Sequence, residues 1–275
     1  RLPASYRSSF SATEALCDAR RIAVVGPDRP IIIDYYREQG QSSLQDSLKI
    51  YHHDRPVSLS RRVPVLENMG FRVISERTFE VQGSPEGLVF IHDMELENAF
   101  GQAIYLTDGG KLFEAVFLSV WRQEADNDFF NALAQTASLD VSAIGVLRAY
   151  GRYLQQIGIS QSHGFVAGVL SRYPEIARAL YEMFILRLRP TSSKEDIASS
   201  KRIKAKIKEA LNDVPNIDDD TIIRRYLNLI EATLRTNHFV PGLSERGQSL
   251  ALKLDSRIID GLPEPRPWSE IFVYG

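Results

Sequence analysis

Residues 71–81 read FRVISERTFEV, and residues 88–96 read LVFIHDMEL. The apolar residues of the first stretch occupy positions of one parity: Phe71, Val73, Phe79 and Val81. Because side chains alternate along a β-strand, this pattern predicts a half-buried strand that turns all four to one face. Ser84-Pro85-Glu86-Gly87 follows, with Pro and Gly where a type I turn prefers them. These stretches therefore predict a β-hairpin.

Two further β-like runs precede this hairpin, at Pro30 to Tyr36 and at Leu44 to His53. In the second run, Leu48 and Ile50 share one face, whereas Lys49 takes the other. Three or four strands with short connections favour an antiparallel sheet with helices packed on one face. The predicted fold class is therefore α+β.

Helix signals flank these runs. Ser11 and Glu14 have the spacing of a capping box, in which a hydroxyl and a carboxylate each bond a free amide at a helix start. A second helix is expected over residues 58–69, closed by Gly70 in the left-handed conformation. Pro64 lacks an amide donor, so we expect this helix to start late or to have a distorted first turn.

After about residue 108 the period of the apolar pattern changes from two to 3.6, and it keeps that value to about residue 237. Asp126 and Asp140 each stand where a helix N-cap is expected. A last helix is expected over Thr221 to Asn237. This section predicts an all-helical bundle, and the apolar runs at 249–254 and 270–274 predict a C-terminal strand pair.

The composition argues against several classes of protein. The 275 residues include 33 Lys+Arg and 35 Asp+Glu, a formal net charge of -2, so no global positive field attracts nucleic acid or an anionic membrane. Cys17 is the only cysteine, which excludes an intrachain disulfide and fits a reducing cytoplasm. No apolar run approaches the roughly 18 residues of a membrane span. We therefore expect a cytoplasmic protein with neither a nucleic acid nor a membrane as partner.

No catalytic or metal-binding motif emerges from the sequence. His52 and His53 are adjacent on one predicted strand and so point to opposite faces, and the other three histidines are isolated. Gly109 to Lys111 resembles part of a phosphate loop, but we expect it to loosen the turn into a helix near Lys111. Asp126 to Asp128 begins like a calcium loop without the Gly and Glu that would complete one, so helix capping is favoured.

A basic stretch runs from Lys194 to Glu209. It contains six Lys or Arg and three Asp or Glu, and the next eleven residues contain four Asp. The two stretches nearly cancel in charge, and no aromatic residue interleaves the basic ones. A solvated amphipathic helix is the favoured interpretation.

Four blocks of sequence resemble the large bacterial NAD-specific glutamate dehydrogenases. They are residues 63–73 (VPVLENMGFRV), 112–122 (LFEAVFLSVWR), 232–237 (ATLRTN), and 253–257 (KLDSR) with 265–267 (PRP) and 270–274 (EIFVY). Their order and approximate spacing agree with that family, and the match is weakest at residues 26–47 and 191–216. His238 and Ser269 depart from the family pattern, where an aromatic and a bulky apolar residue are expected.

The resemblance implies that the whole enzyme deaminates L-glutamate oxidatively and reversibly to 2-oxoglutarate and ammonia, with hydride transfer to NAD. It also implies ACT-like modules and helical motifs ahead of a dehydrogenase core. The family's substrate lysines, catalytic acid and Rossmann glycines would follow Gly275, so this chain is expected to be an interior piece. The organisation implied is 1–29 as an N-terminal helix and linker, 30–122 as an ACT-like module, 123–240 as a helical domain and 241–275 as strands opening a truncated catalytic domain.

This resemblance implies a structural or regulatory role for the segment, within a homo-oligomer. We expect no catalytic, cofactor-binding or metal-binding residue here, and NAD as the cofactor of the parent enzyme only. ACT-like modules often bind amino acids where a strand-to-helix loop meets a neighbouring sheet. That places candidate effector-binding residues at Asp54, Arg55, Ser58 and Ser60. A solvated loop whose serines cap the next helix is the alternative.

Two other classes of function stay open at this stage. One is a helical protein-interaction adaptor without an enzymatic parent, and the other is a nucleic-acid-binding protein. If residues 249–274 pack back onto the helices, the adaptor hypothesis gains, whereas a projecting strand pair favours a truncated enzyme. Cys17 is expected to be a buried, inert thiol.

Overall fold

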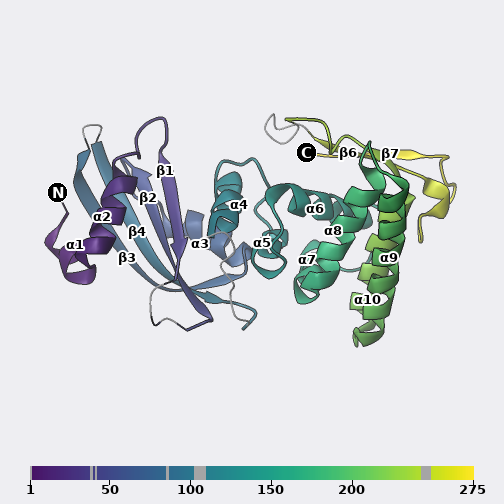
Figure 1. Cartoon of the computed structure of the whole chain (residues 1–275), viewed down its shortest axis with the longest axis horizontal. Helices are drawn as coiled ribbons and strands as arrows, with labels where there is room; N and C mark the ends of the chain where they lie inside the picture. The colour runs from purple at the N-terminus through teal and green to yellow at the C-terminus, as the bar shows by residue number, and fades with distance from the viewer. Residues whose placement is uncertain (1, 38–39, 41, 85–86, 102–109, 243–248) are drawn as a thin grey trace. The chain divides into compact units, whose positions relative to one another are not determined.

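The computed structural model describes residues 2–37, 40, 42–84, 87–101, 110–242 and 249–275. It divides the chain into two compact units, unit 1 (Arg1–Trp121) and unit 2 (Arg122–Gly275) (Figure 1). Among the described residues, no helix is both long enough and apolar enough to cross a membrane. Each unit has its own core.

Unit 1 is built on a four-stranded antiparallel sheet with the order β1-β2-β4-β3. The elements are β1 (Ile31–Tyr36), β2 (Gln45–His53), α3 (Leu59–Asn68), β3 (Phe71–Ser84), β4 (Gly87–Asn98) and α4 (Lys111–Trp121). Strands β2 and β3, joined by α3, run parallel with β4 inserted between them, which is the split β-α-β arrangement. The expected hairpins β1–β2 and β3–β4 are both present. Residues 85 and 86 of the expected type I turn lie outside the described residues.

Helices cover both faces of this sheet, not one face as the strand pattern suggested (Figure 1). On the first, the α4 face, the ring of Tyr35 stacks on Phe113 of α4 with centroids 4.2 Å apart. On the second, the α2 face, Ile32 and its neighbours pack against helices α1 (Ala4–Ser9) and α2 (Ala12–Ile22). The reason is visible in β2, whose residues are buried without alternation from Asp46 to His52.

A bulge in β3 overturns the prediction that its four apolar residues share one face. The pairing with β4 shifts between Val73 and Ser75, and one extra residue in a strand reverses the parity of everything after it. Phe71 therefore packs on the α4 face, with its ring 5.3 Å from Phe113. Phe79 instead joins the core cluster beneath α1 and α2.

The helix signals of unit 1 are largely confirmed. Ser11 and Glu14 form both bonds of the capping box at the start of α2. Gly70, with φ +86°, follows the end of α3 as predicted. Pro64 lies inside α3, which nevertheless begins at Leu59.

Cys17 corrects a prediction, because it is exposed on α2. Residues three to four positions apart share one side of a helix. The side of α2 that meets the sheet carries Asp18 and Ile22, its two buried residues. Cys17 therefore falls outside the buried stripe.

Unit 2 is a helical bundle followed by a small sheet. Its elements are the 3-10 turn η2 (Phe129–Ala132), α5 (Leu133–Thr136), α6 (Val141–Gln156), α7 (His163–Arg172), α8 (Pro174–Leu188), α9 (Lys194–Ala210), η3 (Leu211–Asp213), α10 (Ile217–Ala232), β5 (Thr233–Thr236), β6 (Leu250–Leu254), η4 (Ser256–Ile258) and β7 (Glu270–Tyr274). The predicted strand pair is β6–β7, and β5 adds a third antiparallel strand. Residues 233–236 are therefore a strand and not the end of a helix, because they pair with β6.

Candidate functional site

The four predicted effector-binding residues lie together in unit 1. Asp54 and Arg55 follow the end of β2, and Ser58 and Ser60 stand at the start of α3, all with exposed side chains. Asp54 has a left-handed φ of +66°. Ser58 occupies the N-cap position of α3 without a side-chain cap bond, and its hydroxyl lies 3.2 Å from that of Ser60. The loop thus presents both charges and two hydroxyls at its surface.

Two histidines of the sheet hold this loop in place. The Val57 amide donates to Nε2 of His92 over 3.0 Å, and Nδ1 of His52 lies 2.8 Å from the Arg55 carbonyl oxygen. A backbone amide can only donate, so Nε2 of His92 is the unprotonated ring nitrogen. Burial lowers the pKa of His92 to about 4, with the Arg62 guanidinium as a second cause. His92 is therefore neutral near pH 7.

Arg62 links the loop to strand β3. Its buried guanidinium donates to the Val57 carbonyl oxygen and to the carboxylate of Glu76. Burial raises the pKa of Glu76, but the hydrogen bonds from Arg62 and Thr78 outweigh it and leave that pKa below its ordinary value. No local pattern in the sequence predicts these partners, because Arg62, Glu76 and His92 lie on three different elements.

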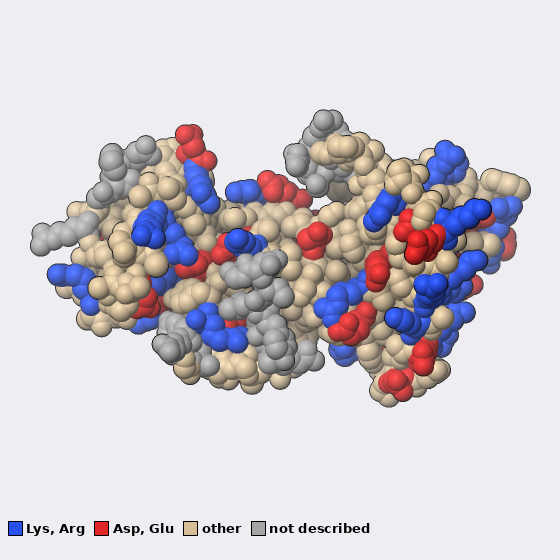
Figure 2. Space-filling model, in the orientation of Figure 1, with Lys and Arg blue, Asp and Glu red and all other residues tan. Residues whose placement is uncertain are grey.

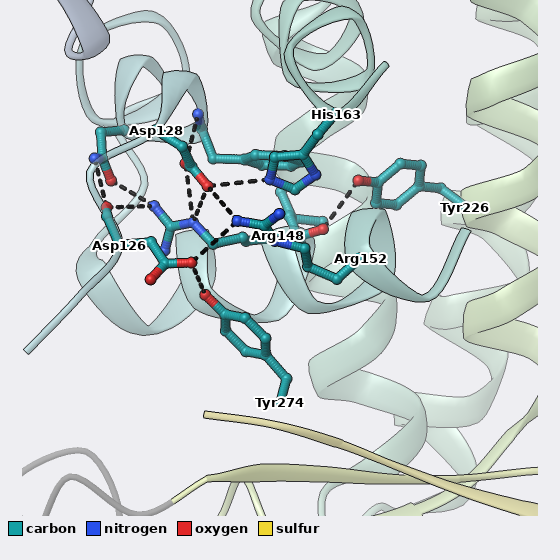
Figure 3. A network of polar contacts seen from close by, with 10 residues as sticks. Asp126, Asp128, Arg148, Arg152, His163, Tyr226 and Tyr274 are labelled. Carbon is teal, nitrogen blue, oxygen red and sulfur yellow. Dashed lines mark hydrogen bonds and ion pairs between the residues drawn. The ribbon is translucent and has the colours of Figure 1, made fainter. Parts of the chain in front are cut away.

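A second polar network lies in unit 2, around the residues between α4 and η2 (Figure 3). Arg148 of α6 is its centre and is 2% exposed. Its Nε lies 3.0 Å from each carboxylate oxygen of Asp128, and its Nη2 donates to Oδ1 of Asn131 over 2.6 Å. His163 of α7 adds a contact of 3.0 Å from Nε2 to Asp128. This inner half ties η2, α6 and α7 together.

Several donors stabilise the ionised form of Asp128. Burial raises its pKa, but the hydrogen bond from His163 and the guanidinium of Arg148 together bring it below the ordinary value. Asp128 also caps η2, since its Oδ1 accepts from the Phe130 amide over 3.1 Å. The helical spacing predicted this cap at Asp126, two residues too early. Asp128 takes that place because the helical turn begins at Phe129.

The outer half of the network is exposed and reaches strand β7. Asp126 and Arg152, 48% and 43% exposed, form an ion pair of 3.3 Å. The hydroxyl of Tyr274 donates to the same Asp126 oxygen over 2.9 Å. Burial is the main cause that raises the pKa of Tyr274 to about 12, so its hydroxyl stays protonated as the donor.

Tyrosine hydroxyls join α6 to the last part of the chain at three more points. Tyr153 donates to Oε2 of Glu270 at the start of β7 over 2.7 Å. Tyr150 lies 2.7 Å from Oγ1 of Thr233 in β5. Tyr226 of α10 donates to the carbonyl oxygen of residue 147 over 2.9 Å (Figure 3). Strand β7 is thus attached to the bundle near both of its ends.

The basic stretch at 194–209 forms helix α9. Lys204 is ion-paired with Glu231 of α10. Figure 2 shows the basic side chains of this part of the surface interspersed with acidic ones. This arrangement fits the amphipathic helix predicted from the sequence.

Among the described residues, no group of three or more His, Cys, Asp or Glu side chains could hold a metal ion. Gly110, in the stretch that resembles a phosphate loop, has φ +84°, and a Cβ there would lie 2.6 Å from the Tyr35 carbonyl oxygen. The backbone of Tyr35 therefore lies too close to Gly110 for a side chain at this position. Gly109 lies outside the described residues.

Three family models match the chain in succession. They are the ACT3 domain of glutamate dehydrogenase at residues 30–108, helical motif 3 of glutamate dehydrogenase at 125–190, and the catalytic domain of bacterial NAD-glutamate dehydrogenase at 206–275. The chain belongs to the NAD-specific glutamate dehydrogenase family. The resemblance stated from the four sequence blocks is thereby confirmed.

Curated relatives agree with this assignment. The chain is 39% identical to the NAD-specific glutamate dehydrogenase of Halomonas elongata over 98% of its length, and 34% identical to that of Pseudomonas aeruginosa over 99%. Identity to the enzyme of Mycobacterium tuberculosis is 33% over 98%. The chain spans 17% of the length of each of these relatives.

The packing of β7 was a poor criterion for choosing between an adaptor and a dehydrogenase. The strand does pack back onto the helices, through Tyr153 and Phe272, whose ring centroids are 5.3 Å apart, a result that would have favoured the adaptor. The family assignment instead favours the dehydrogenase. In this chain the helical motif and the strands matched by the catalytic-domain model pack as one unit.

Proposed function

We propose that this chain is a non-catalytic regulatory and scaffold segment of an NAD-specific glutamate dehydrogenase. The observation that supports this most directly is the succession of an ACT3 match, a helical-motif match and a catalytic-domain match within 275 residues. The segment would join regulatory modules to a catalytic core. The polar contacts of α6 with β5, β7 and α10 join the helical motif to the part of the chain matched by the catalytic-domain model.

The parent enzyme would convert L-glutamate, NAD and water to 2-oxoglutarate, ammonia and NADH in the cytoplasm. The chain by itself is proposed to be inactive and to bind no NAD. The test is the formation of NADH from L-glutamate and NAD by the purified chain, with the Halomonas elongata enzyme as positive control. A rate above the no-protein blank would contradict the proposal.

The exposed loop after β2 is the proposed effector site, for a small amino acid. Arg55 offers a partner for its carboxylate and Asp54 one for its ammonium group, with the hydroxyls of Ser58 and Ser60 beside them. His92 holds the loop in position by accepting a hydrogen bond from the Val57 amide. Calorimetric titration with each of the twenty amino acids tests this site.

The controls for that titration come from the same unit. Asp54→Asn and Arg55→Gln should abolish the heat of binding, whereas Arg20→Gln, an exposed arginine of α2, should leave it unchanged. If none of the twenty amino acids gives a heat of binding, only the scaffold role remains. Self-association as a homo-oligomer is proposed as part of that role, and light scattering of the eluted chain measures it.

A further inference from the structure

A row of alternating charges crosses the sheet of unit 1. In the strand register Asp34 lies opposite Lys49, Lys49 opposite Asp93, and Asp93 opposite Arg77. Directly opposite residues of antiparallel strands point to the same face, so all four side chains lie on the α2 face. Arg77 donates to Asp93 over 2.7 Å, and the Lys49 side chain is 3% exposed.

Helix α2 extends this row from outside the sheet. Its Arg21 pairs with Asp34 over 2.6 Å, and its Asp18 accepts from Nζ of Lys49 over 2.9 Å. Asp18 also accepts from the hydroxyl of Tyr51 in the sheet over 2.7 Å and from that of Tyr6 in α1. One buried carboxylate therefore joins α1, α2 and the sheet.

The N-terminal segment contributes three buried apolar side chains to this face, Tyr6, Ile22 and Val25. Leu2, Phe10 and Ala15 are partly buried against the same cluster. They cover an apolar half of the sheet face that consists of Ile32, Tyr51, Phe79, Val81, Val89 and Ile91. Residues 4–25 also lie before the ACT3 match, which begins at residue 30.

The sheet does not need these helices to balance its charges. Without α2, Lys49 still lies opposite Asp34 and Asp93 in the strand register, and Asp93 still lies opposite Arg77. A buried ion pair such as the one between Asp18 and Lys49 adds little net stability to the docked state. Both a covered and an uncovered α2 face are therefore consistent with the charges present.

We propose that residues 4–25 form a releasable cover over the α2 face, docked by Asp18. In the docked state the cover itself occupies the apolar half of that face. In the released state α1 and α2 leave together, since Tyr6 and Asp18 are bonded to each other. The cover is thus a conformational device of unit 1, independent of the proposed effector site.

Hydrogen exchange of the whole chain, read peptide by peptide, tests this proposal. In the unsubstituted chain, amides of α1 and α2 should exchange through an opening that leaves β2 and β4 protected. Asp18→Asn should speed exchange in residues 4–25 at least about tenfold and leave β2, β4 and unit 2 unchanged. Asp28→Asn, an exposed aspartate beyond the same helix, is the matched control.

Each other outcome decides against the cover. Exchange in Asp18→Asn equal to that in Asp28→Asn, or loss of the whole unit 1 fold in Asp18→Asn, would overturn it. Ile22→Ala provides a second variant that weakens the apolar contact and keeps the Asp18 carboxylate on Lys49. It should speed exchange in residues 4–25 alone, and equal acceleration in β2 and β4 would contradict the proposal.

Discussion

Arg148 and Asp128 are joined through both carboxylate oxygens, each 3.0 Å from Nε of the arginine. Twenty positions separate the two residues in the chain, and the pair connects α6 to the start of η2. Its arginine is almost completely buried. This ion pair is therefore the central contact of the polar network in unit 2.

Replacement of Arg148 by Met should destabilise unit 2 strongly. It leaves the largely buried Asp128 with His163, a backbone amide and the more distant Arg152, 3.8 Å away, as partners. Removal of one partner of a buried pair costs about 3–5 kcal/mol. Urea unfolding followed by far-ultraviolet circular dichroism measures the loss. Arg152→Met is the control, because Arg152 is 43% exposed and its ion pairs with Asp126 and Asp128 contribute about 0–1 kcal/mol each. Equal losses in the two variants would refute the prediction.

Acid should destabilise unit 1 through His92. Its pKa is about 4 in the folded chain and 6.5 as the ordinary value, so between those values the unfolded chain binds a proton that the folded chain does not. The free energy of unfolding should fall as pH falls from 6.5 to 4, by at most about 1.4 kcal/mol per pH unit from this group.

The variant His92→Gln isolates this contribution. Glutamine retains an acceptor for the Val57 amide but does not titrate in this range. The difference in unfolding free energy between the unsubstituted chain and His92→Gln should therefore depend on pH between 4 and 6.5. His53→Gln serves as the control, because His53 is the last residue of β2 and lies on a different strand from His92. A pH-independent difference for His92→Gln would show that His92 is not the group responsible.

Two glycines of α6 should respond to alanine with opposite signs. A Cβ at Gly151 would lie 2.7 Å from Cζ of Phe130 and 2.9 Å from the hydroxyl of Tyr226, whereas one at Gly145 meets nothing within 4 Å. Gly151→Ala should destabilise by about 1–3 kcal/mol through overpacking. Gly145→Ala should stabilise by about 0.5–1 kcal/mol, because alanine loses less entropy in a helix. Thermal unfolding compares them, and a shared sign would contradict the packing described here.

Loss of a tyrosine hydroxyl should loosen β7 locally. Tyr153→Phe and Tyr274→Phe each remove one contact, to Glu270 and to Asp126 respectively. A hydrogen bond of this kind contributes about 1 kcal/mol, so amide exchange in β7 should rise about fivefold. Tyr173→Phe is the control, because Arg172 continues to hold its partner Asp219 through two bonds. Unchanged exchange in both β7 variants would mean that the strand is held by its backbone pairing alone.

Local signals in the sequence predicted local structure well. The capping box of Ser11 and Glu14 and the cap of Asp140 form as expected, because each needs only residues within one helical turn. The bulge after Val73 escaped prediction, because it depends on how β3 pairs with β4 and not on the strand's own pattern. The cap at Asp128 was missed by two residues for a similar reason, since Arg148 and His163 also bind that carboxylate.

The sequence by itself determined the four strands of unit 1, the strand pair β6–β7, the helical section, the loop with the four candidate residues and the family. These follow from hydrophobic period, turn residues and short motifs, which act over a few residues. Only the tertiary structure decided that α1 and α2 cover the second face of the sheet and that His92 supports the candidate loop. It also decided the row from Asp34 to Arg77, because alternating charges become neighbours only when four strands take one register. Such contacts join residues far apart in the chain, where no local pattern records them.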